Sequence, residues 1–321
     1  MVTTSASSSR SAIALMFPGQ GAQFPGMASD IVSQDNECAR ILESADRILG
    51  YPLSEIMAGK RGDELNHTVY TQPAIFVHSM LVWRLVQRRL NIRPMVAAGH
   101  SLGEYSALCA AGALDFADAL RIVKVRAECM HSAQPLGSCG MAAVIGIPVE
   151  RVREIVSSVR ERSVLDLANL NSPEQSVISG EISALDRAVQ MAGKEKRSRV
   201  VGLHVSSAFH TSLMESARET LSDSLNEIHF GAIQFTVIAN VNAAPYPAQD
   251  RDMKSLLLDQ VVSPVLWEAC VRKMISMGAR IFLEIGPGKV LSGLLKRIDR
   301  SVSAISVSDF QGVVNLDGAL P

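Results

Sequence analysis

The sequence predicts an α/β protein in which a large domain surrounds a parallel sheet and a smaller α+β domain is inserted into it. In both outer parts of the chain, continuous apolar runs that end in small-residue loops alternate with stretches of helical spacing. The middle part changes to six short elements in a different order. With 321 residues, the chain is long enough for one large domain or two unequal ones.

The first part of the chain alternates strands and helices. A continuous apolar run predicts a strand buried on both faces at Ala12–Phe17, and a shorter apolar run predicts a second strand at Met95–Gly99. Helical spacing covers Met27–Leu49 and Pro73–Leu90, between these strands. Two more helices follow, and Asp115 is expected to cap the second one.

The middle part has the order β-α-β-β-α-β of a ferredoxin-like domain. The six elements are expected at 140–147, 149–159, 164–170, 175–179, 182–192 and 199–205. We therefore expect the large domain at 1–132 and 206–321, with the small domain at 133–205. Residues 1–10 are Ser/Thr-rich without an apolar segment, so they predict a disordered tail and no secretion signal.

The last part returns to the alternation of the first. A helix is expected from about Ser212, and another at Val265–Met277. Strands are expected at Phe235–Ala239 and Ile281–Ile285, the latter followed by a glycine-rich turn and a helix.

The pentapeptide Gly99-His-Ser-Leu-Gly103 lies between a predicted strand and a predicted helix. This context predicts a nucleophile elbow with a strained backbone at Ser101. Side chains in place of the two glycines would collide with the neighbouring strand and helix. The alternative is a chance match in a Gly-rich loop, because the pattern is short.

Three other features are compatible with the same chemistry. The loop Pro18–Gln23 lacks both nucleotide-binding glycine patterns and can instead direct backbone N–H groups at a reaction centre. His210 precedes a predicted helix, whose positive end favours a neutral general base, although an ordinary loop histidine is the alternative. Arg126 has apolar neighbours one helical turn away on both sides, so it requires a ligand anion, an internal Asp or Glu, or a route to the surface.

Composition excludes several classes of protein. Charged residues make up 20% of the chain and the formal net charge is −1, which gives no electrostatic case for nucleic-acid binding. No uncharged apolar run approaches the ~20 residues of a membrane span. The five scattered cysteines are typical of core thiols in a reducing compartment, and no metal-ligand pattern occurs. We expect a cytoplasmic protein that needs no metal or redox cofactor.

Six motifs occur between about Ala14 and Arg300: Phe17-Pro-Gly-Gln-Gly21, Thr71-Gln-Pro-Ala74, Gly99-His-Ser-Leu-Gly-Glu-Tyr-Ser106, Asn169-Leu-Asn-Ser-Pro173, Ser207-Ala-Phe-His210 and Glu284-Ile-Gly-Pro-Gly-Lys289. In this order they resemble malonyl-CoA:acyl carrier protein acyltransferases, including the freestanding enzymes of fatty acid and polyketide synthesis. The resemblance implies an α/β-hydrolase-like large domain with a ferredoxin-like insert.

The resemblance also implies catalytic roles. Ser101 would accept the acyl group, with His210 as its general base. The backbone N–H groups of Gln20 and Leu102 would form the oxyanion hole. The backbone carbonyl of Gln260 would orient the histidine.

For the substrate, the resemblance implies that Arg126 pairs with the malonyl carboxylate. Ala208 before Phe209-His210 is similar to malonyl-selective members of the family. Further residues of the same pocket are expected to be Gln72, Asn171, Met130 and Phe209.

The implied reaction is a ping-pong transfer. Malonyl would pass from malonyl-CoA, through a seryl ester, to the phosphopantetheine thiol of an acyl carrier protein supplied in trans. An acyl-thioester hydrolase is an alternative, with Asp166 or Asp186 completing a triad, although both fall in the predicted small domain. A non-catalytic acyl-binding protein is the third possibility.

A basic cluster precedes the strand that leads to His210: Lys194, Lys196, Arg197 and Arg199. Carrier proteins of this kind of pathway are usually acidic, so the cluster is a candidate docking site. A solvated charged loop is the alternative interpretation.

Overall fold

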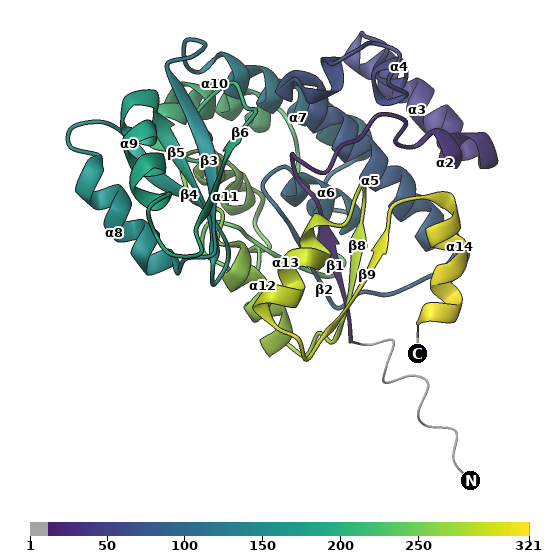
Figure 1. Cartoon of the computed structure of the whole chain (residues 1–321). Helices are drawn as coiled ribbons and strands as arrows, with labels where there is room; N and C mark the ends of the chain where they lie inside the picture. Colours follow the sequence, from purple (N-terminus) through teal and green to yellow (C-terminus); the bar gives the residue numbers. More distant parts are fainter. Residues whose placement is uncertain (1–11, 321) are drawn as a thin grey trace.

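The computed structural model describes residues 12–320, so the predicted disordered tail lies outside the described residues. Two sheets organise these residues, and Figure 1 shows them side by side. The strands of sheet A are β1 (Ile13–Phe17), β2 (Val96–Gly99), β7 (Thr236–Ile238), β8 (Ile281–Ile285) and β9 (Ser303–Val307). Those of sheet B are β3 (Cys139–Ile145), β4 (Leu165–Ser172), β5 (Gln175–Glu181) and β6 (Arg199–Leu203).

Sheet A is parallel throughout, with the strand order β7-β2-β1-β8-β9. Its central strand β1 is buried on both faces: Ile13, Leu15 and Phe17 contribute to one hydrophobic core, and Ala14 and Met16 to another. A strand between two helix layers has to be apolar on both sides, which explains the continuous apolar run in the sequence.

Sheet B is antiparallel, with the order β4-β5-β3-β6. Helices α8 (Val149–Val159) and α9 (Ile182–Ala192) pack against it over a separate hydrophobic core. This is the ferredoxin-like arrangement that the order of elements predicts. We propose that residues 133–205 form the small domain and that, among the described residues, 12–132 and 206–320 form the large one.

The remaining helices belong to the region around sheet A. They are α2 (Ser29–Gln34), α3 (Asn36–Leu49), α4 (Leu53–Met57), η2 (Glu64–Asn66), α5 (Thr68–Leu90), α6 (Gly103–Ala110), α7 (Phe116–Ser132), η3 (Ser212–Met214), α10 (Glu215–Asn226), α11 (Asp250–Val262), α12 (Trp267–Ser276), α13 (Val290–Ile298) and α14 (Phe310–Ala319). In Figure 1, α14 lies beside α5, at the edge of the molecule opposite α8.

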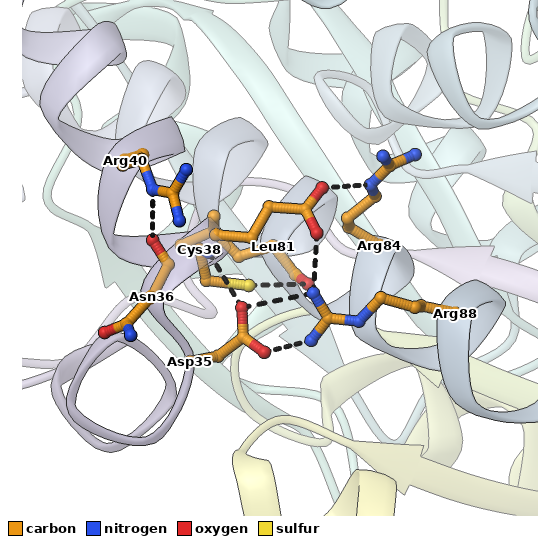
Figure 2. Close-up of polar contacts among 8 residues, drawn as sticks. Asp35, Asn36, Cys38, Arg40, Leu81, Arg84 and Arg88 are labelled. Atoms are coloured by element: carbon orange, nitrogen blue, oxygen red, sulfur yellow. Dashed lines mark hydrogen bonds and ion pairs between the residues drawn. The ribbon is translucent and has the colours of Figure 1, made fainter.

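The stretch predicted as one helix from Met27 to Leu49 is two helices. Asp35 has an extended backbone between them, and its side chain accepts a hydrogen bond from the Cys38 N–H, so it caps α3. The same carboxylate pairs with Arg88 at the end of α5 (Figure 2). Glu37 pairs with Arg88 and Arg84, so charged groups join α3 to α5.

Other boundaries also differ from the predictions. The helix expected at Val265–Met277 begins at Trp267, because Val265 forms a bridge with Asn169 of β4. The helix after His210 is capped by Thr211 and opens with a short 3₁₀ turn. The sequence patterns missed α11, β9 and α14, of which α11 carries Gln260.

Candidate active site

The predicted nucleophile elbow is present between β2 and α6. Ser101 has φ 51°, the left-handed conformation that non-glycine residues adopt rarely. A Cβ at Gly99 would lie 1.8 Å from the Gly103 carbonyl carbon, and one at Gly103 would lie 2.1 Å from the Phe17 oxygen. Only glycine therefore fits at positions 99 and 103, two residues before and two residues after the serine.

Asn240 holds the elbow from the end of β7. Its side-chain oxygen accepts from the Ser101 N–H at 2.8 Å, and its amide donates to the Gly99 carbonyl at 2.7 Å. The side chain is fully buried, so both bonds lie away from water. The strained turn is thus stabilised by a residue that is 139 positions away in the sequence.

His210 lies beside the serine. Its Nε2 is 2.8 Å from Ser101 Oγ, and its Nδ1 is 2.8 Å from the backbone oxygen of Gln260. A carbonyl oxygen only accepts hydrogen bonds, so Nδ1 carries the proton and Nε2 is free to accept from the serine. Burial and then the charge of Arg126 lower the pKa of His210 to about 3, so the ring is neutral at pH 7.

Arg126 reaches the same serine from α7. Its Nη2 donates to Ser101 Oγ and to the side-chain oxygen of Gln260, each at 3.0 Å, and Nη1 donates to Gln72. The guanidinium is almost fully buried and lies over the Tyr105 ring. Within residues 12–320 it forms no ion pair, and its Nε has no hydrogen-bond partner. The internal salt bridge considered for Arg126 is therefore absent from this part of the chain.

A cleft of about 90 Å³ opens over these groups. Eight of the ten residues expected in the site line it: Gln20, Gln72, Ser101, Leu102, Arg126, Met130, Phe209 and His210. In the described part of the chain, neither the Gln20 N–H nor the Leu102 N–H donates a hydrogen bond. Both N–H groups are therefore available to a developing oxyanion. A Cβ at Gly19 would come within 2.4 Å of the His100 oxygen, so a glycine at this position allows the loop to approach the elbow.

The other two expected residues lie behind the cleft. Gln260 contacts His210 and Arg126 from α11 without lining the cavity. The side chain of Asn171 accepts from His100 Nε2 at 2.8 Å, while Asn169, two residues earlier in β4, lines the cleft. Burial lowers the pKa of His100, which keeps that ring neutral too.

Several residues at the site were not predicted from the sequence. The cleft is also lined by His100, Met141, Asn169, Leu203 and Val205. Glu104 and Tyr246 lie beneath it, joined by a 2.5 Å hydrogen bond. His100 and Glu104 belong to the motif around Ser101, and Asn169 is the first residue of another motif. Their positions within these motifs were the signal that could have identified them as site residues. Nothing local in the sequence points to Asn240 or Tyr246.

Residues 12–320 contain neither a cluster of metal-ligating side chains nor a helix suited to a membrane. No group of three His, Cys, Asp or Glu side chains is arranged to hold a metal ion. No helix in this range combines the length and the apolar character that a membrane span requires. All five cysteines are free thiols, four of them buried.

A serine on an elbow at the carboxyl end of a parallel sheet, hydrogen-bonded to a neutral histidine, defines a protein of the class that works through an acyl-enzyme ester. The acyl transferase domain family matches residues 15–318. The chain belongs to that family.

Individual relatives are similar over nearly the whole chain. The malonyl CoA-acyl carrier protein transacylase of Bacillus subtilis is 40% identical over 300 residues, covering 93% of this chain and 94% of that protein. The solved structure of the transacylase of that name from Clostridium perfringens has a TM-score of 0.91 at 35% identity, covering 97% of both chains. A type II polyketide malonyl-transacylase, solved in complex with its acyl carrier protein, has a TM-score of 0.92 at 36% identity, covering 95% of this chain and 98% of that one. The α/β fold predicted from the sequence is confirmed by these structures.

Proposed function

We propose that this protein transfers malonyl from malonyl-CoA to the phosphopantetheine thiol of an acyl carrier protein, through an ester on Ser101. The names of its relatives support both the donor and the acceptor. The observation that carries the proposal is the buried Arg126 guanidinium, which lies 3.0 Å from the nucleophile and forms no ion pair within residues 12–320. A malonyl ester on Ser101 carries its free carboxylate within reach of that cation.

In the first half-reaction, Ser101 Oγ attacks the thioester carbonyl carbon and its proton passes to His210 Nε2. The carbonyl oxygen gains negative charge, which the N–H groups of Gln20 and Leu102 stabilise. The carbon–sulfur bond then breaks, coenzyme A leaves as a thiol with the proton from His210, and the malonyl ester remains.

In the second half-reaction, the carrier's thiol attacks the ester carbonyl and His210 accepts its proton. Collapse of the oxyanion returns the acyl group to a thioester and the proton to Ser101. The chain's own side chains and backbone supply each of these steps, and malonyl-CoA enters as a substrate.

The triad predicted by the hydrolase alternative finds no support around His210. Its Nδ1 is paired with a backbone carbonyl, where a hydrolase triad has a carboxylate. Asp166 lies in β4, within ion-pair distance of Arg160, and Asp186 lies in α9 on the outside of sheet B.

The proposal also places the protein in the cytoplasm, where its five free thiols remain reduced.

The experiment is incubation with malonyl-CoA labelled in the malonyl group, with and without a holo carrier protein. We expect stable label on Ser101 that moves to the carrier when it is added. Rapid release of free malonate would instead support the hydrolase, and absence of any label would support a binding protein.

A further inference from the structure

Glu104 is a buried carboxylate three residues after the nucleophile, in the first turn of α6. Its Oε1 accepts from the Tyr246 hydroxyl at 2.5 Å and from the Asn240 N–H at 3.2 Å. Its Oε2 accepts from the side-chain amide of Gln260. All three partners are donors, which is the arrangement that suits an ionised carboxylate.

Gln260 connects this carboxylate to the reacting groups. Its amide nitrogen donates to Glu104 and, at 2.9 Å, to the Ser101 carbonyl, while its side-chain oxygen accepts from Arg126. Its backbone oxygen faces His210 Nδ1. An amide has one donating and one accepting end, so Glu104 determines which end faces Arg126.

We propose that Glu104 is a positioning residue whose carboxylate fixes the orientation of the Gln260 side chain, and through it the placement of Arg126 and His210 around Ser101. His210 Nδ1 is paired with the backbone oxygen of Gln260, and Glu104 places a carboxylate on the other side of the Gln260 side chain. This inference rests on the proposed malonyl transfer for its assay.

Protonation of Glu104 breaks the arrangement. A hydrogen on Oε1 reverses the bond with Tyr246 and leaves Oε2 an uncharged, weaker acceptor for Gln260. A hydrogen on Oε2 points at the amide hydrogens of Gln260, so the amide has to turn over. Its NH₂ group then faces the guanidinium of Arg126, donor against donor, and the Ser101 carbonyl loses one of its donors. The ionised form of Glu104 is therefore the one that supports acylation.

Burial raises the pKa of Glu104 to about 7, against the opposing effect of its hydrogen bonds and of Arg126. The other titratable groups that face it are Arg126 on α7, Tyr105 on its own helix, Tyr246 before α11 and Cys270 on α12. Burial raises the pKa values of both tyrosines and of the cysteine, so these three stay neutral between pH 5 and pH 9. The pKa of His210, at about 3, lies below this range. Glu104 is the group of this set that titrates near neutral pH.

The test is the pH dependence of the rate at which Ser101 is acylated by malonyl-pantetheine, a thioester without nucleotide phosphates. We expect the wild-type rate to fall below pH 7. Glu104→Gln should remove this dependence and leave a rate about 10- to 100-fold below the wild-type plateau. Tyr246→Phe removes a hydrogen bond that stabilises the carboxylate, so it should move the acid limb to higher pH.

A matched control is Glu284→Gln on β8, which removes a second buried carboxylate, one that accepts from the backbone of α13. This variant should keep the acid limb of the wild type. The inference is wrong, and Glu104 only supports the fold, if the acylation rate of Glu104→Gln still falls below pH 7. It is also wrong if Tyr246→Phe does not move the acid limb of the rate to higher pH. If Glu104→Gln does not fold, the pH profile of Tyr246→Phe by itself tests the inference. Failure of the proposed function is distinct, because the wild type then forms no malonyl ester at any pH.

Discussion

The Arg126 guanidinium and the His210 imidazole meet on the same atom, Ser101 Oγ, at 3.0 and 2.8 Å. One group is a permanent cation and the other is kept neutral by burial and by that cation. In the reaction that we propose, the imidazole takes the proton of the serine and the guanidinium binds the carboxylate of the malonyl ester. The groups for catalysis and for substrate choice would then meet at a single oxygen atom.

Replacing Ser101 with alanine should abolish the acyl-enzyme and leave the fold intact. Among the described residues the hydroxyl's hydrogen-bond partners are His210 and Arg126, so we expect the free energy of unfolding to change by less than about 1 kcal/mol. Mass spectrometry after incubation with malonyl-CoA should find no added malonyl group, and transfer should fall below about 1% of wild type. Substantial residual transfer by a well-folded variant would contradict the role of Ser101.

Replacing Arg126 with alanine should change the substrate preference. Loss of the partner of a buried carboxylate costs about 2–5 kcal/mol, which corresponds to a fall of roughly 30- to 5,000-fold in kcat/KM for malonyl-CoA. Acetyl-CoA has no such carboxylate, so its kcat/KM should be spared or improved. Both thioesters are to be compared on the same preparation.

Arg126→Lys is a control that keeps the positive charge and removes the planar guanidinium, which can make two parallel hydrogen bonds to a carboxylate. Its malonyl transfer should remain impaired. A purely structural Arg126 predicts that both activities fall in parallel with thermal stability. A preserved preference for malonyl in Arg126→Ala would refute the assignment.

The basic cluster of Lys194, Lys196, Arg197 and Arg199 should steer the carrier protein. All four side chains are exposed. The first three lie between α9 and the edge strand β6, and Arg199 begins β6, whose other end at Leu203 lines the cleft. Neutralising the four should raise KM for the carrier and flatten its salt dependence, while acylation of Ser101 by malonyl-CoA without the carrier stays unchanged. A variant that instead neutralises the exposed Arg47, Lys60 and Arg93 should behave like wild type. Unchanged transfer at low salt would leave the cluster as solvated surface.

Glu104 should make stability depend on pH. Its pKa rises from 4.5 to about 7 on folding, so its contribution is fully present below pH 4.5 and is lost as pH rises through 7. At about 1.4 kcal/mol per pH unit, the free energy of unfolding of wild type relative to Glu104→Gln should fall by about 3 kcal/mol over this range. Urea unfolding at several pH values measures it. A constant difference would show that the carboxyl has an ordinary pKa in the folded protein.

Local patterns in the sequence were sufficient for much of the architecture. The apolar run that forms β1 predicts a strand buried on two faces, and the glycines around Ser101 predict the elbow, because both depend on residues adjacent in the chain. The helices at 149–159 and 182–192 were predicted with their observed bounds, because each has a strongly one-sided apolar pattern. The apolar surroundings of Arg126 pointed to its burial without identifying its partners.

Only the tertiary structure decided how the site is held together. Glu104 and Gln260 are 156 positions apart, and α11, which carries Gln260, has only a weak one-sided apolar pattern. In β4 the pairing register shifts on both sides of Asn169–Leu170, so simple alternation does not tell whether Asn169 or Asn171 faces the cleft. Local sequence patterns predict most of the elements and many of the chemistry-bearing residues. The hydrogen bonds that orient those residues join distant segments, and they exist only after the two sheets have packed around them.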